Sequence, residues 1–357
     1  MARIDTLRLA ALQDGLITRS QALATGLTAS ALRYSARPGG RWQRLLPGVY
    51  ATFSGPVQDI HKLRAAVLAA GEGSMVTGPW ACRAAGLRYG PDPGEWVDAL
   101  IGWRHDRGNI GFVRVTRTKR LPEPLWWIDE HRLEELRHGE RPLSVVMEQL
   151  GHVPVPGIIP MAPAARAVVD TVVRPHRLPG GWQPACTSPA GCPDCRDDGH
   201  RAGALRNVRA LMCEVVQRRL TSVSALRDEV AAAPRRGAAL ARQAMRDVEA
   251  GCRSAPECEL RDLVRTSRVL PEPRWNRVLP GQRDIYPDAC WPDARLVAEV
   301  DSRSYHGFGD APRRTEERRA RYAALGWRVL PVAPARLRTE PHVVLGELEA
   351  AYLVRGA

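Results

Sequence analysis

Lysine is almost absent from this 357-residue chain. Only Lys62 and Lys119 stand among its 52 basic residues, and the rest are arginine. Together with the abundance of alanine and glycine, this bias is typical of a GC-rich coding sequence, which raises the arginine count without any functional cause. The formal charge of +13 makes nucleic acid the first partner to consider. The charge alone does not establish that partner.

Long apolar runs are also missing. No stretch approaches the roughly 18–20 apolar residues that a membrane helix needs, which excludes an integral membrane protein. The first residues, Met1 to Ala11, lack a basic segment followed by an apolar core, so we expect no secretory signal and a cytoplasmic location. The eight cysteines are irregularly spaced, and we expect buried apolar residues or metal ligands instead of a disulfide framework.

The composition is that of a folded chain, with 44% hydrophobic and 25% charged residues. At roughly 100–200 residues per domain, the length predicts two or three domains. We expect a multi-domain α/β protein. The segments we distinguish are 1–54, a mixed α/β part at 55–176, a Cys/Pro/Gly-rich insertion at 177–200, a helical connector at 201–250 and a last module at 251–345.

The N-terminal segment predicts three short helices followed by a basic hairpin. Thr18 and Thr28 are expected N-caps, and Arg41 to Tyr50 predicts two strands around a Pro-Gly turn. This order is typical of a winged helix-turn-helix, whose third helix enters the major groove while the wing contacts phosphate. The alternative is a small helical cap that binds no DNA. The candidate DNA-binding residues are Arg33, Tyr34, Arg41 and Arg44.

The stretch GLITRSQALATGLTASALRYSARPGGRWQRLLPGVYAT resembles the N-terminal domain of AbiEi-type antitoxins from type IV toxin–antitoxin systems. The resemblance continues more loosely through AAVLAAGEGSMVTGPWACRAAGL, where we expect one helix followed by a second. It implies a winged-helix DNA-binding role. A cognate toxin as partner stays open, because this domain is used widely.

The middle of the chain predicts strands at Val97–Ile101 and Gly111–Thr116 and a helix at Ala164–Val173, without a catalytic constellation. Its scattered histidines are expected to be surface or capping residues. They are His105, His131, His152 and His176. The connector at 201–250 predicts three helices with solvated arginine faces.

The insertion contains a possible zinc site with the spacing C-x5-C-x2-C-x4-H. Three thiolates and one imidazole suit tetrahedral zinc, which would restrain a long loop that lacks periodicity. The alternative is a disordered insertion with free thiols. The candidate ligands are Cys186, Cys192, Cys195 and His200.

The last module places several carboxylates on neighbouring strands. Alternation along 295–301 puts Glu299 and Asp301 on one face, and Asp288 lies on the strand at 284–291. A helix at 313–325 and a strand at 327–332 complete a strand–helix–strand crossover. Clustered carboxylates repel unless a cation lies among them, and Mg²⁺ prefers such oxygen ligands. His306 is close enough in sequence to act as a general base or acid.

The stretches SAPECELRDLV, YPDACWPDARLVAEVDSRSYH and ARYAALGWRVL resemble the very-short-patch-repair-endonuclease-like branch of the PD-(D/E)XK nucleases. The resemblance implies a restriction-endonuclease-like α/β/α core and a metal-dependent endonuclease. Asp288 and Glu299 match the two metal-binding acids, Glu257 the acid on the first helix, and His306 the histidine that ends the motif. Asp301 stands where lysine is usual, which leaves the general base open.

Structural explanations exist for the same residues. Glu257 follows Ser254 by three positions, the spacing of a capping box. Asp288 and Asp301 can form surface ion pairs, and His306 can be structural. A DNA-binding regulator or antitoxin without chemistry therefore remains the alternative function, and the sequence does not indicate an oligomeric state.

Overall fold

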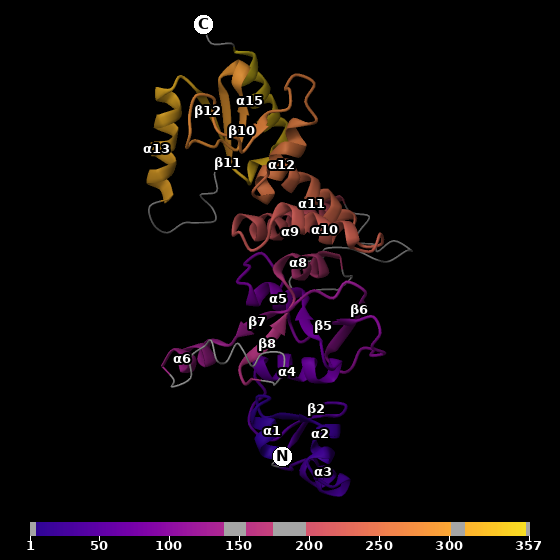
Figure 1. Ribbon diagram of the computed structural model, residues 1–357. Coiled ribbons are helices and arrows are strands. Elements are labelled where there is room, and N and C mark those ends of the chain that lie inside the picture. Colours follow the sequence, from indigo (N-terminus) through magenta and orange to yellow (C-terminus); the bar gives the residue numbers. More distant parts are fainter. Residues whose placement is uncertain (1–4, 139–154, 174–197, 301–310, 355–357) are drawn as a thin grey trace. The chain divides into compact units, whose positions relative to one another are not determined.

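The computed structural model describes residues 5–138, 155–173, 198–300 and 311–354 (Figure 1). The chain divides into two compact units, Met1–Thr171 with Arg177–Gly181, and Val172–His176 with Trp182–Ala357. Both units combine helices with sheets, so the predicted multi-domain α/β class is confirmed. None of the helices in the described part of the chain is long and apolar enough to cross a membrane.

The first unit begins with the element order of a winged helix-turn-helix. These elements are α1 (Thr6–Ala11), β1 (Leu16–Thr18), α2 (Arg19–Ala24), α3 (Ala29–Ser35), β2 (Gln43–Leu46) and β3 (Val49–Ala51). Thr18 and Thr28 cap α2 and α3 as predicted, each accepting a backbone N–H with its hydroxyl. The strands form one sheet in the order β1-β3-β2. Strand β1 was not predicted, because three residues show no periodicity.

The rest of the first unit is a five-stranded sheet in the order β6-β5-β4-β8-β7. Its elements are α4 (Asp59–Ala70), β4 (Met75–Thr77), α5 (Gly78–Ala84), β5 (Val97–Gly102), β6 (Val113–Thr118), β7 (Leu125–Ile128), α6 (Glu130–His138), β8 (Ile158–Met161) and α8 (Ala164–Val173). The predicted strands appear as β5 and β6, and α8 has the predicted bounds. The expected pair of consecutive helices is interrupted by β4, which forms the centre of the sheet.

Arg64 connects the winged helix to this sheet. It lies on α4 with 4% of its surface exposed, and its Nε is 2.7 Å from Asp14 Oδ2. Its Nη2 donates to the carbonyls of Val155 and Ile158 at 2.7 and 2.8 Å, and Gly157 N–H donates to Asp14 Oδ1 at 2.6 Å. A buried guanidinium is tolerated because it is paired and hydrogen-bonded. These bonds join three separate stretches of the first unit.

The second unit contains a helical part, α9 (Asp198–Gln217), α10 (Val223–Ala232) and α11 (Ala239–Glu249). Ser222 caps α10, and its hydroxyl accepts the Ala225 N–H. The expectation of solvated arginine faces is wrong for Arg209, which is 3% exposed. Arg209 lies against Asp247 of α11, at 2.7 Å from its carboxylate. The helices therefore pack around a buried ion pair that no local pattern indicates.

The last module has the predicted three-layer α/β/α arrangement (Figure 1). Its sheet has the order β12-β11-β10-β9, in which β11 and β12 are parallel. The elements are α12 (Ala255–Val264), β9 (Arg274–Trp275), β10 (Ala289–Trp291), β11 (Leu296–Val300), α13 (Ala311–Ala324), β12 (Arg328–Val332), α14 (Arg336–Thr339) and α15 (Pro341–Leu353). Strand β10 is shorter than the predicted strand over 284–291.

The two faces of β11 separate as the alternation predicts. Leu296 and Ala298 pack in a core with α12 and α15, whereas Val297 packs with Tyr322 of α13 and Cys290 of β10. Both Tyr322 and Val297 are fully buried. The side of the sheet that carries Glu299 is therefore the one that α13 covers.

Candidate functional site

Asp288 and Glu299 lie opposite each other at one end of the β10–β11 ladder. The antiparallel register pairs Ala289 with Ala298 and Cys290 with Val297. Continuing it by one residue places Asp288 across from Glu299. Directly opposed residues share a face of the sheet. The structure thus brings together the two residues that the sequence proposes as metal ligands.

Asp288 is a half-buried carboxylate with one oxygen engaged. Its Oδ2 accepts the Val300 N–H at 2.7 Å, and no described residue donates to its Oδ1. Removal from water and the nearby Glu257 carboxylate raise the pKa of Asp288 to about 7, against the Val300 N–H and the charges of Arg318 and Arg253, which lower it. A carboxyl group in this state favours a proton or a cation as partner.

Glu257 is held at the start of α12, with 6% of its surface exposed. Ser254 Oγ donates to Oε1 and Arg253 N–H donates to Oε2, both at 2.8 Å, and Ser254 Oγ accepts the Glu257 N–H at 3.3 Å. Asn276 Nδ2 adds a bond of 2.6 Å to Oε2. Glu257 therefore takes part in the N-terminal cap of α12, as its spacing from Ser254 predicts. Glu257 acts on the site through its charge, since its carboxylate oxygens are already bonded.

Glu299 is 4% exposed and is held by two residues of α13. Tyr322 Oη donates to Oε1 at 2.6 Å, and the Arg318 guanidinium forms an ion pair with Oε2. Burial raises the pKa of Tyr322 to about 12, so its hydroxyl remains a donor. Sequence reasoning missed both partners. The sequence feature that could have indicated Arg318 and Tyr322 as partners is their spacing. They are four residues apart on the arginine-rich helix, which places them on one face of it.

Asp288 and Glu299 supply oxygen donors of the kind that Mg²⁺ prefers. Arg318 already forms an ion pair with Glu299 Oε2, so a metal ion bound to this oxygen would displace the guanidinium. When bound, such an ion lowers the pKa of a ligated water and neutralises charge on a phosphate. Among the residues that the structure describes, no three Asp, Glu, His or Cys side chains form a metal-binding group. Asp301 and His306 lie outside the described residues.

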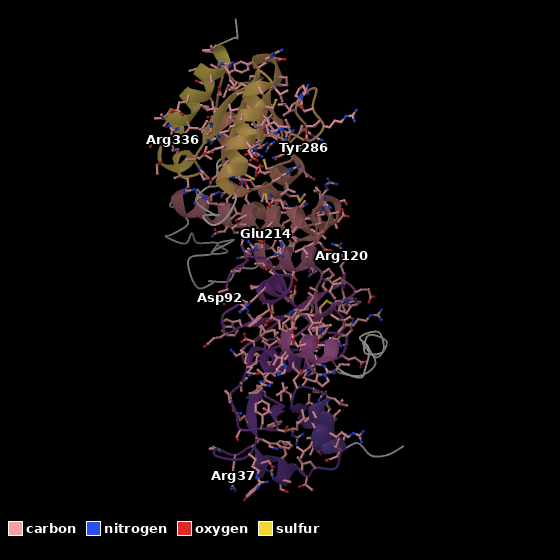
Figure 2. All side chains as sticks on the ribbon, turned by 90° about the vertical axis from the view of Figure 1, so that its left-hand side faces the viewer. Arg37, Asp92, Arg120, Glu214, Tyr286 and Arg336 are labelled. Atoms are coloured by element: carbon pink, nitrogen blue, oxygen red, sulfur yellow. The ribbon has the colours of Figure 1, made fainter. Side chains whose placement is uncertain are left out.

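The predicted DNA-binding residues all lie on the surface of the winged helix. Arg33 and Tyr34 of α3 are exposed, and so are Arg41 and Arg44 at the hairpin. Tyr34 is 65% exposed. The guanidinium of Arg37, a residue labelled in Figure 2, lies 3.8 Å from the centre of the Tyr34 ring. Arg37 was not among the predicted residues. Its stacking on Tyr34 extends the basic surface beyond them.

Comparisons with known proteins identify no function. No family model matches the chain. Two proteins of Mycobacterium tuberculosis are similar to it, "Uncharacterized protein MT2308" from strain CDC 1551 / Oshkosh and "Uncharacterized protein Rv2248" from strain ATCC 25618 / H37Rv. Each is 32% identical over 147 residues, which cover 39% of this chain and 53% of the relative. The chain therefore spans about half the length of the curated relatives it matches, and neither name states an activity.

The zinc hypothesis falls on residues that the structure does not describe. Cys186, Cys192 and Cys195 lie outside the described residues, and of His200 only its place in α9 is described. The cysteines that the structure does describe are buried, in agreement with the expectation for this chain. Three of them, Cys213, Cys252 and Cys258, lie together where α9 and α12 pack. Hydrogen bonding with Cys258, and after it burial, raises the pKa of the Cys252 thiol.

Neither His105 nor His131 belongs to a group of three or more possible metal ligands among the described residues. His105 and His131 are exposed, as predicted. His152 and His176 lie outside the described residues.

Proposed function

We propose that this chain is a DNA-binding protein whose C-terminal module hydrolyses phosphodiester bonds with a divalent cation. The opposition of Asp288 and Glu299 across β10 and β11 carries this proposal, because it pairs two carboxylates beside a third, Glu257. The order of one helix, three antiparallel strands, a crossover helix and a parallel strand supports it. So does the resemblance of the same stretches to very-short-patch-repair-like nucleases.

The contacts of each residue indicate its role in the proposed reaction. Asp288 and Glu299 would hold Mg²⁺, and Tyr322 fixes the orientation of Glu299 through its 2.6 Å bond. Arg253 and Arg318 add positive charge beside Asp288, which attracts the phosphate backbone. Asp301 and His306 remain the predicted water-positioning and acid–base residues.

A cleavage assay with a matched control tests this function. Wild type should nick supercoiled plasmid or single-stranded DNA in Mg²⁺ or Mn²⁺, and Glu299→Gln should lower the rate by about 100-fold or more, because the amide cannot replace a charged ligand. Glu316→Gln removes an exposed carboxylate from α13 and should cut like wild type. Equal cleavage by Glu299→Gln and wild type would refute the assignment.

A second candidate is a DNA-binding regulator or antitoxin without catalysis. The observation that favours it is the engagement of both Glu299 oxygens by Tyr322 and Arg318, which fills the site with protein groups. A cognate toxin would then be the protein partner. A regulator of this kind should bind DNA without a divalent cation and should not cleave it.

Salt dependence measures the DNA-binding role in both candidates. Replacing Arg41 and Arg44 together by alanine should weaken DNA binding and lower the slope of log affinity against log salt by about 0.9 for each phosphate that the variant leaves unneutralised. Fluorescence anisotropy with a labelled duplex measures this slope. Arg107→Ala changes an exposed arginine of the β5–β6 loop and should leave the slope unchanged. An unchanged slope in the Arg41, Arg44 variant contradicts a wing contact.

A further inference from the structure

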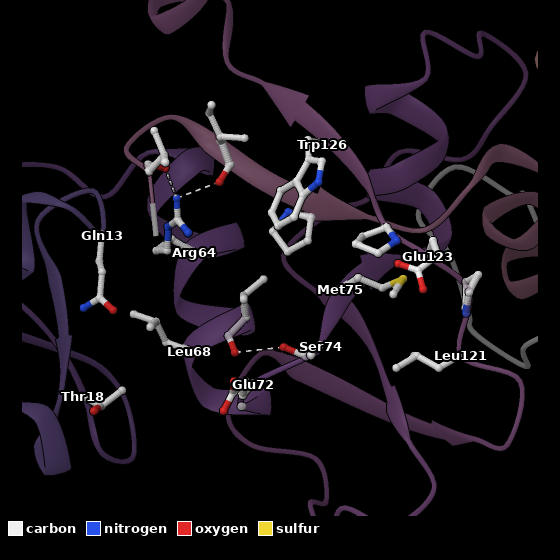
Figure 3. Close-up of a pocket in the computed structure, with 18 of the residues that line it drawn as sticks. Gln13, Thr18, Arg64, Leu68, Glu72, Ser74, Met75, Leu121, Glu123 and Trp126 are labelled. Atoms are coloured by element: carbon white, nitrogen blue, oxygen red, sulfur yellow. Dashed lines mark hydrogen bonds between the residues drawn. The ribbon is translucent and has the colours of Figure 1, made fainter. Parts of the chain in front are cut away.

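A cavity of about 590 Å³ opens in the first unit, beside α4, β7 and β8 and next to the start of α2 (Figure 3). This volume lies in the range of small-molecule sites, which is about 300–1,000 Å³. The walls are largely apolar. The residues that define them best are Val67, Leu68, Met75, Leu121, Trp126 and Ile158.

The charged residues at this cavity leave it negative. Arg64 lines it, but its charge is matched by Asp14 at 2.7 Å and its Nη2 donates to two carbonyls. Glu72 and Glu123 also line it, both are exposed, and neither pairs with a cation among the described residues. Glu72 and Glu123 therefore place two uncompensated negative charges at this cavity, in a chain whose formal charge is +13.

The remaining polar wall offers little to an anion. Gln13 and Gln21 donate to each other's side-chain oxygens, at 3.1 and 2.9 Å, and Gln13 Nε2 also donates to the Leu16 carbonyl at 3.0 Å. Both N–H groups of the Gln13 amide are therefore bonded, and one of those of Gln21. Trp126, half-buried on β7, presents an indole, which attracts cations through its ring face.

We propose that this cavity binds a hydrophobic organic cation. The apolar walls would bury its hydrocarbon surface, the Trp126 indole would contact its charged part, and Glu72 and Glu123 would supply the counter-charge. An apolar anion of the same shape would meet two carboxylates, and the one arginine that lines the cavity already forms an ion pair with Asp14. The proposal does not depend on the nuclease or regulator assignment.

Two ions of nearly the same shape and opposite charge test it on the full-length chain without DNA. Isothermal titration should show saturable binding of tetraphenylphosphonium. Tetraphenylborate should bind at least about tenfold more weakly, since its charge is repelled at the cavity. The net charge of the protein favours the opposite order, so non-specific attraction cannot produce this result.

Matched variants locate the binding. Glu72→Gln with Glu123→Gln should weaken tetraphenylphosphonium binding by about tenfold, because both counter-charges are lost. Glu95→Gln with Glu130→Gln makes the same change in net charge at exposed residues outside the cavity and should have no effect. Trp126→Leu gives an independent loss of affinity. The proposal is overturned if tetraphenylborate binds as well as the cation, if no saturable binding occurs, or if the Glu72, Glu123 variant binds like wild type.

Discussion

Replacing Asp247 by alanine is expected to lower the free energy of unfolding of the second unit by about 3–5 kcal/mol. Asp247 is 3% exposed and receives two buried arginines. Its Oδ2 accepts the Arg209 Nε–H at 2.9 Å and forms an ion pair with Arg209 Nη2 at 2.7 Å, and its Oδ1 accepts an Arg261 Nη1–H at 2.8 Å. The carboxylate thus joins α9, α11 and α12.

The size of this effect comes from the charges that the substitution leaves behind. Burial lowers the pKa of Arg209, but the Asp247 and Asp262 carboxylates raise it by more, so the guanidinium stays charged. Without Asp247, Arg209 keeps Asp262 and Arg261 keeps Glu272 at 3.4 Å, but the side chains of these two carboxylates are 47% and 48% exposed. Two buried guanidinium groups then lose the buried carboxylate that both of them contact, and removing one partner of a buried ion pair costs more than the pair contributed.

Urea unfolding followed by circular dichroism and tryptophan fluorescence measures the loss, with the two units allowed separate transitions. Asp262→Ala is the control, because it removes the exposed partner of the same arginine and should cost less than about 1 kcal/mol. A triple variant, Arg209→Met, Asp247→Leu and Arg261→Met, should recover most of the stability. A loss below about 1 kcal/mol for Asp247→Ala contradicts a stabilising role for this buried carboxylate.

Features that depend on neighbouring residues could be predicted from the sequence, whereas the contacts of Arg209 could not. The caps at Thr18, Thr28 and Ser222 are local, because each hydroxyl bonds a backbone N–H three residues ahead. The helix α8 and the two faces of β11 follow from periodicity alone. Arg209 is different, because its partners are 38 residues or more further along the chain, on other helices.

Several short strands were also not predicted from the sequence. β1 and β4 have three residues each, and β7 and β8 have four, so none shows a period. They exist because neighbours pair with them, as β4 does with β5 and β8.

At the candidate site, Asp288 and Glu299 were predicted from the alternation along their strands and from the resemblance to PD-(D/E)XK nucleases. Their partners depend on tertiary contacts: Tyr322 and Arg318 come from α13, and Asn276, which binds Glu257, precedes β10. Asn276 has a φ of 47°, a left-handed conformation that asparagine tolerates better than most residues, and this is the one local signal it carries.

Asp288→Asn is expected to make the protein more stable at pH 8 while abolishing cleavage. Burial and the Glu257 carboxylate raise the pKa of Asp288 from 3.8 to about 7, so the folded state holds this proton more tightly than the unfolded chain does. The stabilisation from the protonated group is complete below pH 4 and is lost as the pH rises through 7. Asparagine remains neutral and can still accept the Val300 N–H.

The stability difference between the two proteins should therefore grow between pH 4 and pH 8. Each unit of pKa difference between the folded and unfolded states corresponds to about 1.4 kcal/mol. Because solvent screens the half-buried carboxylate, we expect a difference in the free energy of unfolding of only about 1–2 kcal/mol at pH 8. Urea unfolding at several pH values measures this difference. Asp293→Asn, at an exposed carboxylate in the turn after β10, should show no such trend.

Divalent cations should reverse the order of stability, since Mg²⁺ and the proton compete for the same carboxylate. Added Mg²⁺ should raise the stability of wild type at pH 8 and leave Asp288→Asn unchanged, and its apparent affinity should fall about tenfold per pH unit below pH 7. If Asp288→Asn is less stable than wild type at pH 8 without metal, the result contradicts an unfavourable interaction of the ionised Asp288 carboxylate with its surroundings in the folded protein. A stabilising substitution that removes activity would instead identify Asp288 as a residue retained for chemistry, since the fold is more stable without its charge.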